Sequence, residues 1–338
     1  MAAAPRGRKR GLLVLLLAGL AVLAALLAGQ RAVLRSWYGA GPLAEPRNVI
    51  VPRGGSDAVA AVLARAGVID ATLPFLIGTR LTQGEGPLRA GEFAFPASAS
   101  LRDVLSILRT ATPVQRRVTL PEGLTTAQAL AILMRAPGLA GEPPPPPEGS
   151  LFPETYPYEW GAQRADIIAR ARAAMEKVLA EAWEGRAENL PFASVREALV
   201  LASIVERETA LAGERARIAG VFVNRLRRNM PLQSDPTVIY AVSGGTGVLD
   251  RPLSRADLDL DNPFNTYRNR GLPPGPIAAP GLASITAVLH PEANDFLYFV
   301  ADGSGAHVFA RTLDEHNRNV GRLREVERQR TVPVRAVN

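Results

Sequence analysis

Two glutamates at the end of an apolar run are the residues best suited by position to acid–base chemistry. Residues 198–205 are apolar except for Ser203, and Glu206 and Glu208 stand directly beyond them. A helix that is apolar on every face is a buried helix. A carboxyl group set against apolar packing has its charged form disfavoured, so its pKa rises toward the range useful to a general acid. Residues two apart do not share a helix face, and periodicity alone leaves open which glutamate is buried, or whether both mark where the helix emerges into solvent.

The sequence before and after these two glutamates predicts the helices that would position them. Ser194 followed by Glu197 fits a capping box, which predicts that the helix begins there. A second apolar helix ends near Asn224. Asp235 followed by Pro236 predicts the start of a third helix, with Asp235 as N-cap and therefore in a structural role.

A loop at residues 262–275 is rich in Asn, Pro and Gly, and it contains Asn265 and Tyr267. Such a loop can offer amide hydrogen bonds and a ring face to a sugar, although the same composition is also typical of plain turns. The sequence leaves both interpretations open.

Several other chemistries find no support in the sequence. Only three histidines are present, and none forms a paired metal-ligand pattern, so a catalytic metal is not predicted. Cysteine is absent, and the only lysines are Lys9 and Lys177, which leaves little basis for a Schiff-base cofactor. No nucleotide-binding or nucleophile-elbow motif appears. We therefore expect no cofactor.

The N-terminus predicts a membrane anchor. Residues 11–29 contain only Gly, Ala, Val and Leu, and as a helix these 19 residues nearly match a hydrocarbon core of roughly 30 Å. The basic cluster in residues 6–10 favours a cytoplasmic tail at 1–10, a transmembrane helix at 11–30, and the rest of the chain on the periplasmic side of the inner membrane. The alternative is a cleaved signal peptide, whose apolar region is usually shorter.

Charge gives no reason to expect nucleic acid as a partner. Basic residues before the first acid, Glu45, supply six of the seven net positive charges. The excess therefore belongs to the anchor region rather than to a folded surface.

Beyond the anchor the sequence predicts an α+β fold in two parts. Three segments, at 49–63, 93–108 and 118–133, each combine a short apolar strand, a proline, a Ser or Thr and an amphipathic helix. They predict a strand-helix module at 47–137. Five consecutive prolines mark a linker or loop at 138–149, and a mainly helical domain is expected at 150–330.

At these residues the chain resembles the endolytic murein transglycosylases, the MltG or YceG-like family of membrane-anchored cell-wall enzymes. The matching stretches are long, keep their order and together cover most of residues 48–320. They lie at 121–123 (PEG), 148–156 (EGSLFPETY), 202–209 (ASIVERET), 223–226 (VNRL), 233–237 (QSDPT), 253–255 (LSR), 265–267 (NTY), 271–277 (GLPPGPI) and His307. Leu124 and Ser150 depart from the aromatic residues expected at their positions.

The resemblance implies a LysM-like module in the strand-helix repeats and a lytic transglycosylase activity in the domain that follows. It assigns the catalytic role to Glu206, which would protonate the leaving oxygen of the β-1,4 bond between N-acetylmuramic acid and N-acetylglucosamine. As a carboxylate, Glu206 would then take the C6 hydroxyl proton, giving a 1,6-anhydro end and limiting strand elongation. The residues it implies for substrate binding are Gln233, Asn224, Asn265, Tyr267 and Glu154. Peptidoglycan glycan strands are the implied partner, and the resemblance also points to peptidoglycan synthases.

Two alternatives stay open at this point. A hydrolase would need a second carboxylate, and Glu154, Glu208 and Asp235 are available in the sequence, so only the resemblance favours the lytic route. The other alternative is a membrane-anchored protein that binds peptidoglycan without cutting it, in which Glu206 is structural.

Overall fold

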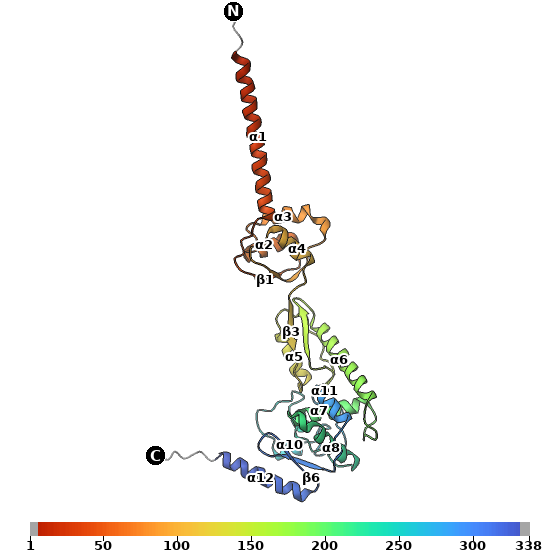
Figure 1. The fold of residues 1–338 in the computed structure, drawn as a ribbon. Helices are drawn as coiled ribbons and strands as arrows, with labels where there is room; N and C mark the ends of the chain where they lie inside the picture. Colours follow the sequence, from red (N-terminus) through yellow and green to blue (C-terminus); the bar gives the residue numbers. More distant parts are fainter. Residues whose placement is uncertain (1–5, 332–338) are drawn as a thin grey trace, which may run out of the picture. The chain divides into compact units, whose positions relative to one another are not determined.

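The computed structural model describes residues 6–331, and side chains from 15 to 329. It divides into two compact units (Figure 1): residues 1–116 with 159–161, and residues 117–158 with 162–338. Residues 1–5 of the predicted cytoplasmic tail lie outside the described residues. The predicted mixture of helices and short strands behind an apolar N-terminal helix is confirmed.

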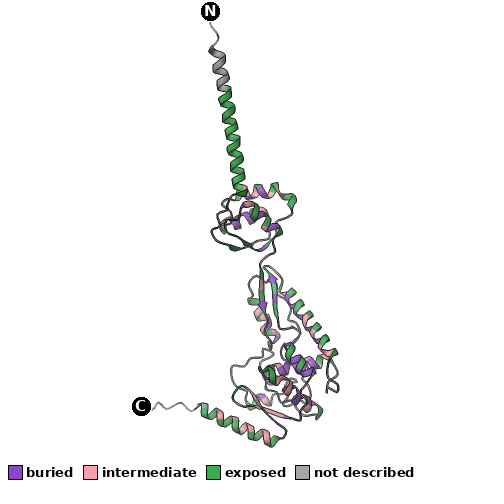
Figure 2. Cartoon of the chain, in the orientation of Figure 1, coloured by how far each residue is buried: buried purple, intermediate pink, exposed green. Residues whose placement is uncertain are grey.

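The N-terminal helix α1 (Arg6–Tyr38) is longer than the predicted anchor. Residues Leu15–Tyr38 are long and apolar enough, by length and composition, to cross a membrane. Residues 15–36 are exposed on every face of the helix (Figure 2). Residues 30–38 contain neither proline nor glycine, so the helix continues until Trp37 packs against the core of the first unit.

The rest of the first unit is a small α+β module. It contains β1 (Arg47–Val51), α2 (Ser56–Arg65), α3 (Thr72–Leu81), a short 3-10 turn η1 (Gln83–Glu85), β2 (Gly91–Phe95) and α4 (Leu101–Thr110). β1 and β2 are antiparallel, with Val49 opposite Phe93. The helices cover this sheet because its inward residues and theirs share one apolar core, which includes Leu63, Phe75, Phe93, Phe95 and Leu105.

The second unit begins with the third predicted strand-helix segment. β3 (Gln115–Thr119) pairs with β4 (Thr155–Glu159). Helices α5 (Thr126–Arg135) and α6 (Arg164–Glu184) share a buried cluster with these strands. Val118, Leu133, Tyr156 and Ile167 are buried in one cluster. The boundary between the units therefore falls at residue 116 rather than at the predicted 137, because this segment packs against residues far along the chain.

The remaining elements build a helical core. They are α7 (Val195–Glu208), η2 (Ala212–Glu214), α8 (Arg215–Arg227), α9 (Asp235–Val242), α10 (Arg255–Leu258), α11 (Leu282–Leu289), β5 (Tyr298–Ala301), β6 (His307–Ala310) and α12 (Leu313–Thr331). Residues of α7, α8 and α11 form a single cluster in which Leu201, Ile204 and Phe222 have no exposed surface. The apolar run of α7 at 198–205 is buried as predicted, apart from the partly exposed Leu199, and the capping box from Ser194 to Glu197 is confirmed.

One predicted helix start was wrong. The N-cap of α9 is Ser234, and Asp235 is the first helical residue, followed by Pro236. The Ser234 carbonyl accepts a hydrogen bond from the Thr237 hydroxyl, at 2.7 Å, inside this first turn. The side chain of Asp235 is therefore not used as a cap and is free for another role.

Candidate active site

The two glutamates at the end of α7 lie in different surroundings. The last turn of α7 emerges from the apolar core between α8, α9 and α11, and residues two apart point in different directions. Glu208 points toward the start of α9, where the Ser234 hydroxyl donates a 2.5 Å hydrogen bond to its Oε1. Glu206 points toward the start of α11. The tertiary structure thus separates two side chains that the sequence could not tell apart.

Glu208 lines a cavity of about 520 Å³. Its polar lining includes Arg225, Gln233, Asp235, Tyr267 and His307, in addition to Glu208 itself. These side chains come from α7, α8, the start of α9, the 262–275 loop and β6. Of the residues predicted to bind substrate, Gln233 and Tyr267 therefore lie beside Glu208.

Burial, together with the negative charge of Asp235, raises the pKa of Glu208 to about 7. The hydrogen bond from Ser234 and the positive charge of Arg225 act in the opposite direction without cancelling the rise. A carboxyl group with this pKa is present in both protonation states near neutral pH. It can therefore give up a proton in one step and accept one in the next.

Arg225 supplies a fixed positive charge to the cavity wall. Its Nε donates to the Leu297 carbonyl at 2.6 Å, and its Nη1 donates to the Leu232 carbonyl at 2.8 Å. Burial lowers the pKa of this guanidinium, but from a value so high that it stays charged. The backbone acceptors hold the cation in place without neutralising it.

Three buried hydroxyl groups, of Ser234, Thr237 and Thr266, form a hydrogen-bond network next to the Glu208 carboxyl. Ser234 donates to Glu208, and its own backbone N–H donates to the Thr266 hydroxyl at 3.0 Å. The Thr237 and Thr266 hydroxyls lie 2.8 Å apart and are hydrogen-bonded to each other. All three residues are buried. The orientation of the Glu208 carboxyl is thus set by a network that spans α9 and the 262–275 loop.

Gln233 and Asp235 are held beside Glu208 from the same two elements. Gln233 has a backbone φ of +50°, an uncommon conformation for a side chain other than glycine, and its N–H donates to the Thr266 carbonyl at 3.1 Å. The Tyr267 hydroxyl donates to Asp235 Oδ1 at 2.6 Å. Burial, together with this carboxylate, raises the pKa of Tyr267, so the phenol remains a donor. Local strain that a hydrogen bond maintains next to a cavity is typical of functional sites.

Glu206 has the contacts of a structural ion pair. Only 6% of its side chain is exposed, its Oε1 lies 3.6 Å from Nη2 of Arg215, and its Oε2 accepts the Gly281 N–H at 3.0 Å. Gly281 is the N-cap of α11, so the carboxylate lies at a helix N-terminus, where negative charge is favourable. Glu206 does not line the cavity that contains Glu208.

Asn265 holds the loop together rather than facing the cavity. It has no exposed surface, and its Nδ2 donates to the carbonyls of Leu258 and Leu260, each at 2.9 Å. Its Oδ1 accepts the Tyr267 N–H at 3.0 Å. The predicted contact of Asn265 with a sugar stays a prediction, and these hydrogen bonds support a structural role for its amide instead.

We expect Asn265→Ala to lower the free energy of unfolding by about 2–3 kcal/mol, because two buried carbonyls and the Tyr267 N–H would lose their partner. Urea unfolding measures this change. Asn269→Ala is the matched control, since Asn269 also donates to two carbonyls but is exposed, and it should cost less than about 1 kcal/mol. A normally stable Asn265→Ala protein that had lost glycan binding would contradict the structural role.

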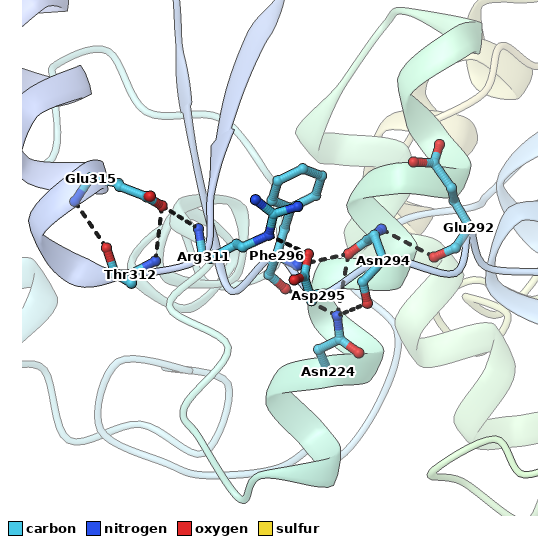
Figure 3. A network of polar contacts seen from close by, with 8 residues as sticks. All are labelled: Asn224, Glu292, Asn294, Asp295, Phe296, Arg311, Thr312 and Glu315. Atoms are coloured by element: carbon cyan, nitrogen blue, oxygen red, sulfur yellow. Dashed lines mark hydrogen bonds and ion pairs between the residues drawn. The ribbon is translucent and has the colours of Figure 1, made fainter.

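Asn224 and Glu154 lie away from Glu208. Asn224 is next to Arg225 in α8 but belongs to a different polar network (Figure 3), where its Nδ2 donates to the carbonyls of Asn294 and Phe296 at 2.9 and 3.1 Å. It lines a separate cavity of about 240 Å³. Glu154 is exposed just before β4, and its backbone carbonyl accepts the Leu120 N–H. The structure therefore does not bring these two predicted residues to the cavity of Glu208.

Sequence reasoning missed two histidines that line the cavity. His307, on β6, is among the residues that carry the resemblance but has no role assigned by it, and its Nδ1 lies 2.7 Å from Oε2 of Glu214. His316, on α12, stacks on Tyr298 with the ring centroids 5.2 Å apart. Burial lowers the pKa of His316, and the nearby Arg225 lowers it further. No spacing signal links these residues to Glu208, because they follow it by about a hundred residues.

Among the described residues, no group of three or more His, Cys, Asp or Glu side chains is arranged to hold a metal ion. The chemistry that the cavity residues themselves can offer is proton transfer by Glu208, beside a second carboxylate, Asp235, and a fixed cation, Arg225.

Comparison with known proteins identifies relatives of this chain. The model of the YceG-like family matches residues 49–322. An endolytic murein transglycosylase of Bacillus subtilis (strain 168) is 43% identical over 173 residues, which cover 51% of this chain and 47% of the relative. The endolytic murein transglycosylase of Streptococcus pneumoniae serotype 2 (strain D39) is 40% identical over 180 residues, covering 51% of this chain and 31% of the relative. The chain thus spans about half or less of the length of these relatives.

A solved structure is similar over a larger part of the chain. The crystal structure of a yceG-like protein from Listeria monocytogenes has a TM-score of 0.53 and 27% sequence identity. The match covers 81% of this chain and 98% of that one.

Proposed function

The chain belongs to the YceG-like family, and on that premise we propose that it is a membrane-anchored lytic transglycosylase of peptidoglycan in which Glu208 is the catalytic acid and base. The observation that carries the proposal is the Glu208 carboxyl, whose pKa is raised to about 7 and which lines a cavity of about 520 Å³. The names of the relatives supply the reaction class and the substrate.

Cleavage needs one group that changes its protonation state twice. Protonated Glu208 donates to the oxygen between N-acetylmuramic acid and N-acetylglucosamine as the bond to C1 breaks. The resulting carboxylate then takes the proton of the C6 hydroxyl, whose oxygen closes onto C1 to form the 1,6-anhydro ring. No water is consumed, and Glu208 ends in the state in which it began.

The neighbours of Glu208 fit this sequence of steps. Asp235 is a second carboxylate in the same cavity and is available to stabilise the positive charge that develops at C1. Tyr267 holds Asp235 in place through its 2.6 Å hydrogen bond. Arg225 is available to favour the carboxylate form of Glu208 after proton donation. The catalytic role of Glu206 given by the resemblance stays a prediction, and the contacts of Glu206 support a structural ion pair instead.

The remaining parts of the chain support a cell-wall setting. We propose that the module at residues 47–110 is LysM-like and binds glycan, since it has two antiparallel strands with two helices between them. We propose α1 as an uncleaved single-pass anchor, with the basic cluster in the cytoplasm and the chain beyond α1 in the periplasm. Peptidoglycan synthases are the partners that cutting of nascent strands would serve.

The products of digestion test the proposed reaction. The full chain in lipid vesicles is incubated with purified sacculi in water enriched in ¹⁸O, and the released fragments are weighed by mass spectrometry. A lytic enzyme gives anhydro ends without ¹⁸O. Reducing ends that carry ¹⁸O would instead identify a hydrolase, with Asp235 as the natural second carboxylate. Binding without any cleavage would favour the peptidoglycan-binding alternative.

A further inference from the structure

Helix α3 of the first unit carries a row of exposed apolar side chains. Leu73, Ile77 and Leu81 are 65%, 50% and 77% exposed. They recur every four residues and therefore lie along one face of the helix. The opposite side of α3 is anchored in the core of the module by Phe75, which is fully buried. Large apolar residues gathered on one exposed face indicate an interaction surface.

This face adjoins the membrane helix. Leu73, Ile77 and Leu81 line a groove of about 280 Å³ together with Ala32, Val33 and Trp37 of α1. Trp37 packs directly on α3, because a Cβ atom added at Gly78 would lie only 2.7 Å from its Cζ3. Figure 1 shows α3 at the edge of the module that α1 enters. The apolar face of α3 and the exposed apolar residues of α1 therefore form one surface.

The position of the groove along α1 matches the lipid headgroup layer. The stretch of purely apolar residues ends at Gly29, and the groove is lined by residues 32–37 of α1. At about 1.5 Å per residue these lie roughly 5–12 Å beyond that stretch. The polar layer of a bilayer is about 5–8 Å thick on each side of the hydrocarbon core. The inner part of the groove therefore lies within this polar layer, where a helix can insert its apolar face.

The charges around the groove suit a lipid surface as well. Arg31 and Arg35 of α1 and Arg80 of α3 are exposed, and α3 itself contains no acidic residue. Arginines beside an apolar helix face are typical of helices that lie on membranes with anionic lipids.

We propose that α3 docks on the outer leaflet of the membrane that α1 crosses, with Leu73, Ile77 and Leu81 inserted at the level of the headgroups. This inference rests on the proposed membrane anchor. The module would then contact the membrane through both α1 and α3, rather than through α1 alone. Its glycan-binding role would then operate at the membrane surface, where new strands appear.

Single fluorescent labels test this docking in the full chain. The protein has no cysteine, so Ile77→Cys, Ala94→Cys and Leu20→Cys each give one labelling site. Ile77 represents the proposed contact. Ala94 is an exposed residue of β2, which pairs with β1 at the edge of the module away from α1 in Figure 1. Leu20 reports on the anchor itself. Each labelled protein is reconstituted in phosphatidylethanolamine–phosphatidylglycerol vesicles, and quenching by spin-labelled lipid and by aqueous iodide is measured.

We expect spin-labelled lipid to quench the Ile77 label at least about twofold more strongly than the Ala94 label, with iodide showing the reverse order. If iodide quenches Ile77 as strongly as Ala94 while Leu20 lies in lipid, the docking is overturned and the anchor stands. If neither quencher reaches Ile77, a protein surface covers α3 and the docking is again overturned. If the Leu20 label is not reached by lipid, the anchor fails and the docking fails with it.

Discussion

Glu208→Gln is expected to lower the rate of glycan cleavage by at least about 1,000-fold, because the variant loses the only group in the cavity that is proposed to carry the proton in both steps. Glutamine keeps the size of the side chain and a carbonyl oxygen that can still accept from Ser234. It cannot donate an acidic proton or take one back. The initial rate of release of soluble fragments from sacculi measures the effect, with circular dichroism to confirm that the variant is folded.

Glu206→Gln is the matched control, because Glu206 and Glu208 flank Arg207 in the same turn of α7. It breaks the ion pair with Arg215 and weakens the contact with Gly281, so it should lower stability by about 1–3 kcal/mol. Below its unfolding temperature it should still cleave within about tenfold of the wild-type rate. A folded Glu206→Gln protein without activity, beside an active Glu208→Gln protein, would show that the assignment made from the resemblance is right and ours is wrong.

The same Glu208→Gln substitution should stabilise the protein at alkaline pH. The pKa of Glu208 is about 7 in the folded protein, against an ordinary value of 4.5, so the folded state binds this proton more tightly than the unfolded state. The stability that the group contributes is fully present below pH 4.5 and is lost as the pH rises through 7. Glutamine does not ionise and loses nothing over this range.

The expected size of this effect follows from the shift. A difference between 4.5 and about 7 corresponds to up to about 3 kcal/mol, by which Glu208→Gln gains on the wild type between acidic and alkaline pH. Urea unfolding of both proteins at pH 4 and at pH 9 gives the difference. Equal changes with pH in the two proteins would mean that Glu208 ionises normally and is not held in a dry environment. A gain in stability with a loss of activity is typical of catalytic residues.

The local elements around the site were predictable, but the choice of glutamate was not. Ser194, Glu197 and the apolar run after them specified α7, because capping and burial depend on residues near each other in the sequence. The environment of Glu208 depends on Ser234, Asp235 and Arg225, which tertiary packing brings to it. A helical wheel contains no information about those partners.

In the 262–275 loop, too, the sequence does not show which side chains face the cavity. Its composition predicted an ordered loop, and both Asn265 and Tyr267 were natural candidates for a sugar site. Only the structure separates them, because Asn265 is buried and fully hydrogen-bonded while Tyr267 reaches the cavity. Residue type sets what a side chain can bind, and packing decides what it does bind.

The compact units of the structure divide the chain at a residue that the strand-helix pattern does not indicate. The strand-helix pattern at 118–133 is equivalent in sequence to the two before it, and it was grouped with them. In the structure its strand β3 pairs with β4, some forty residues later, and its helix α5 packs in the second unit. Local pattern specifies a strand-helix unit but not the strand with which it pairs. The sequence gives no clear signal for α3, because apolar residues lie on both its buried and its exposed sides.

The ionisation of Glu208 itself is the most direct test of the account. Carbon-13 labelling of the glutamate side-chain carboxyls, with the Glu208→Gln variant to assign the resonance, allows this group to be titrated by NMR. The account predicts that the Glu208 carboxyl ionises with a pKa near 7. A resonance that titrates close to 4.5 would contradict it, because a group ionised throughout the neutral range could not supply the first proton.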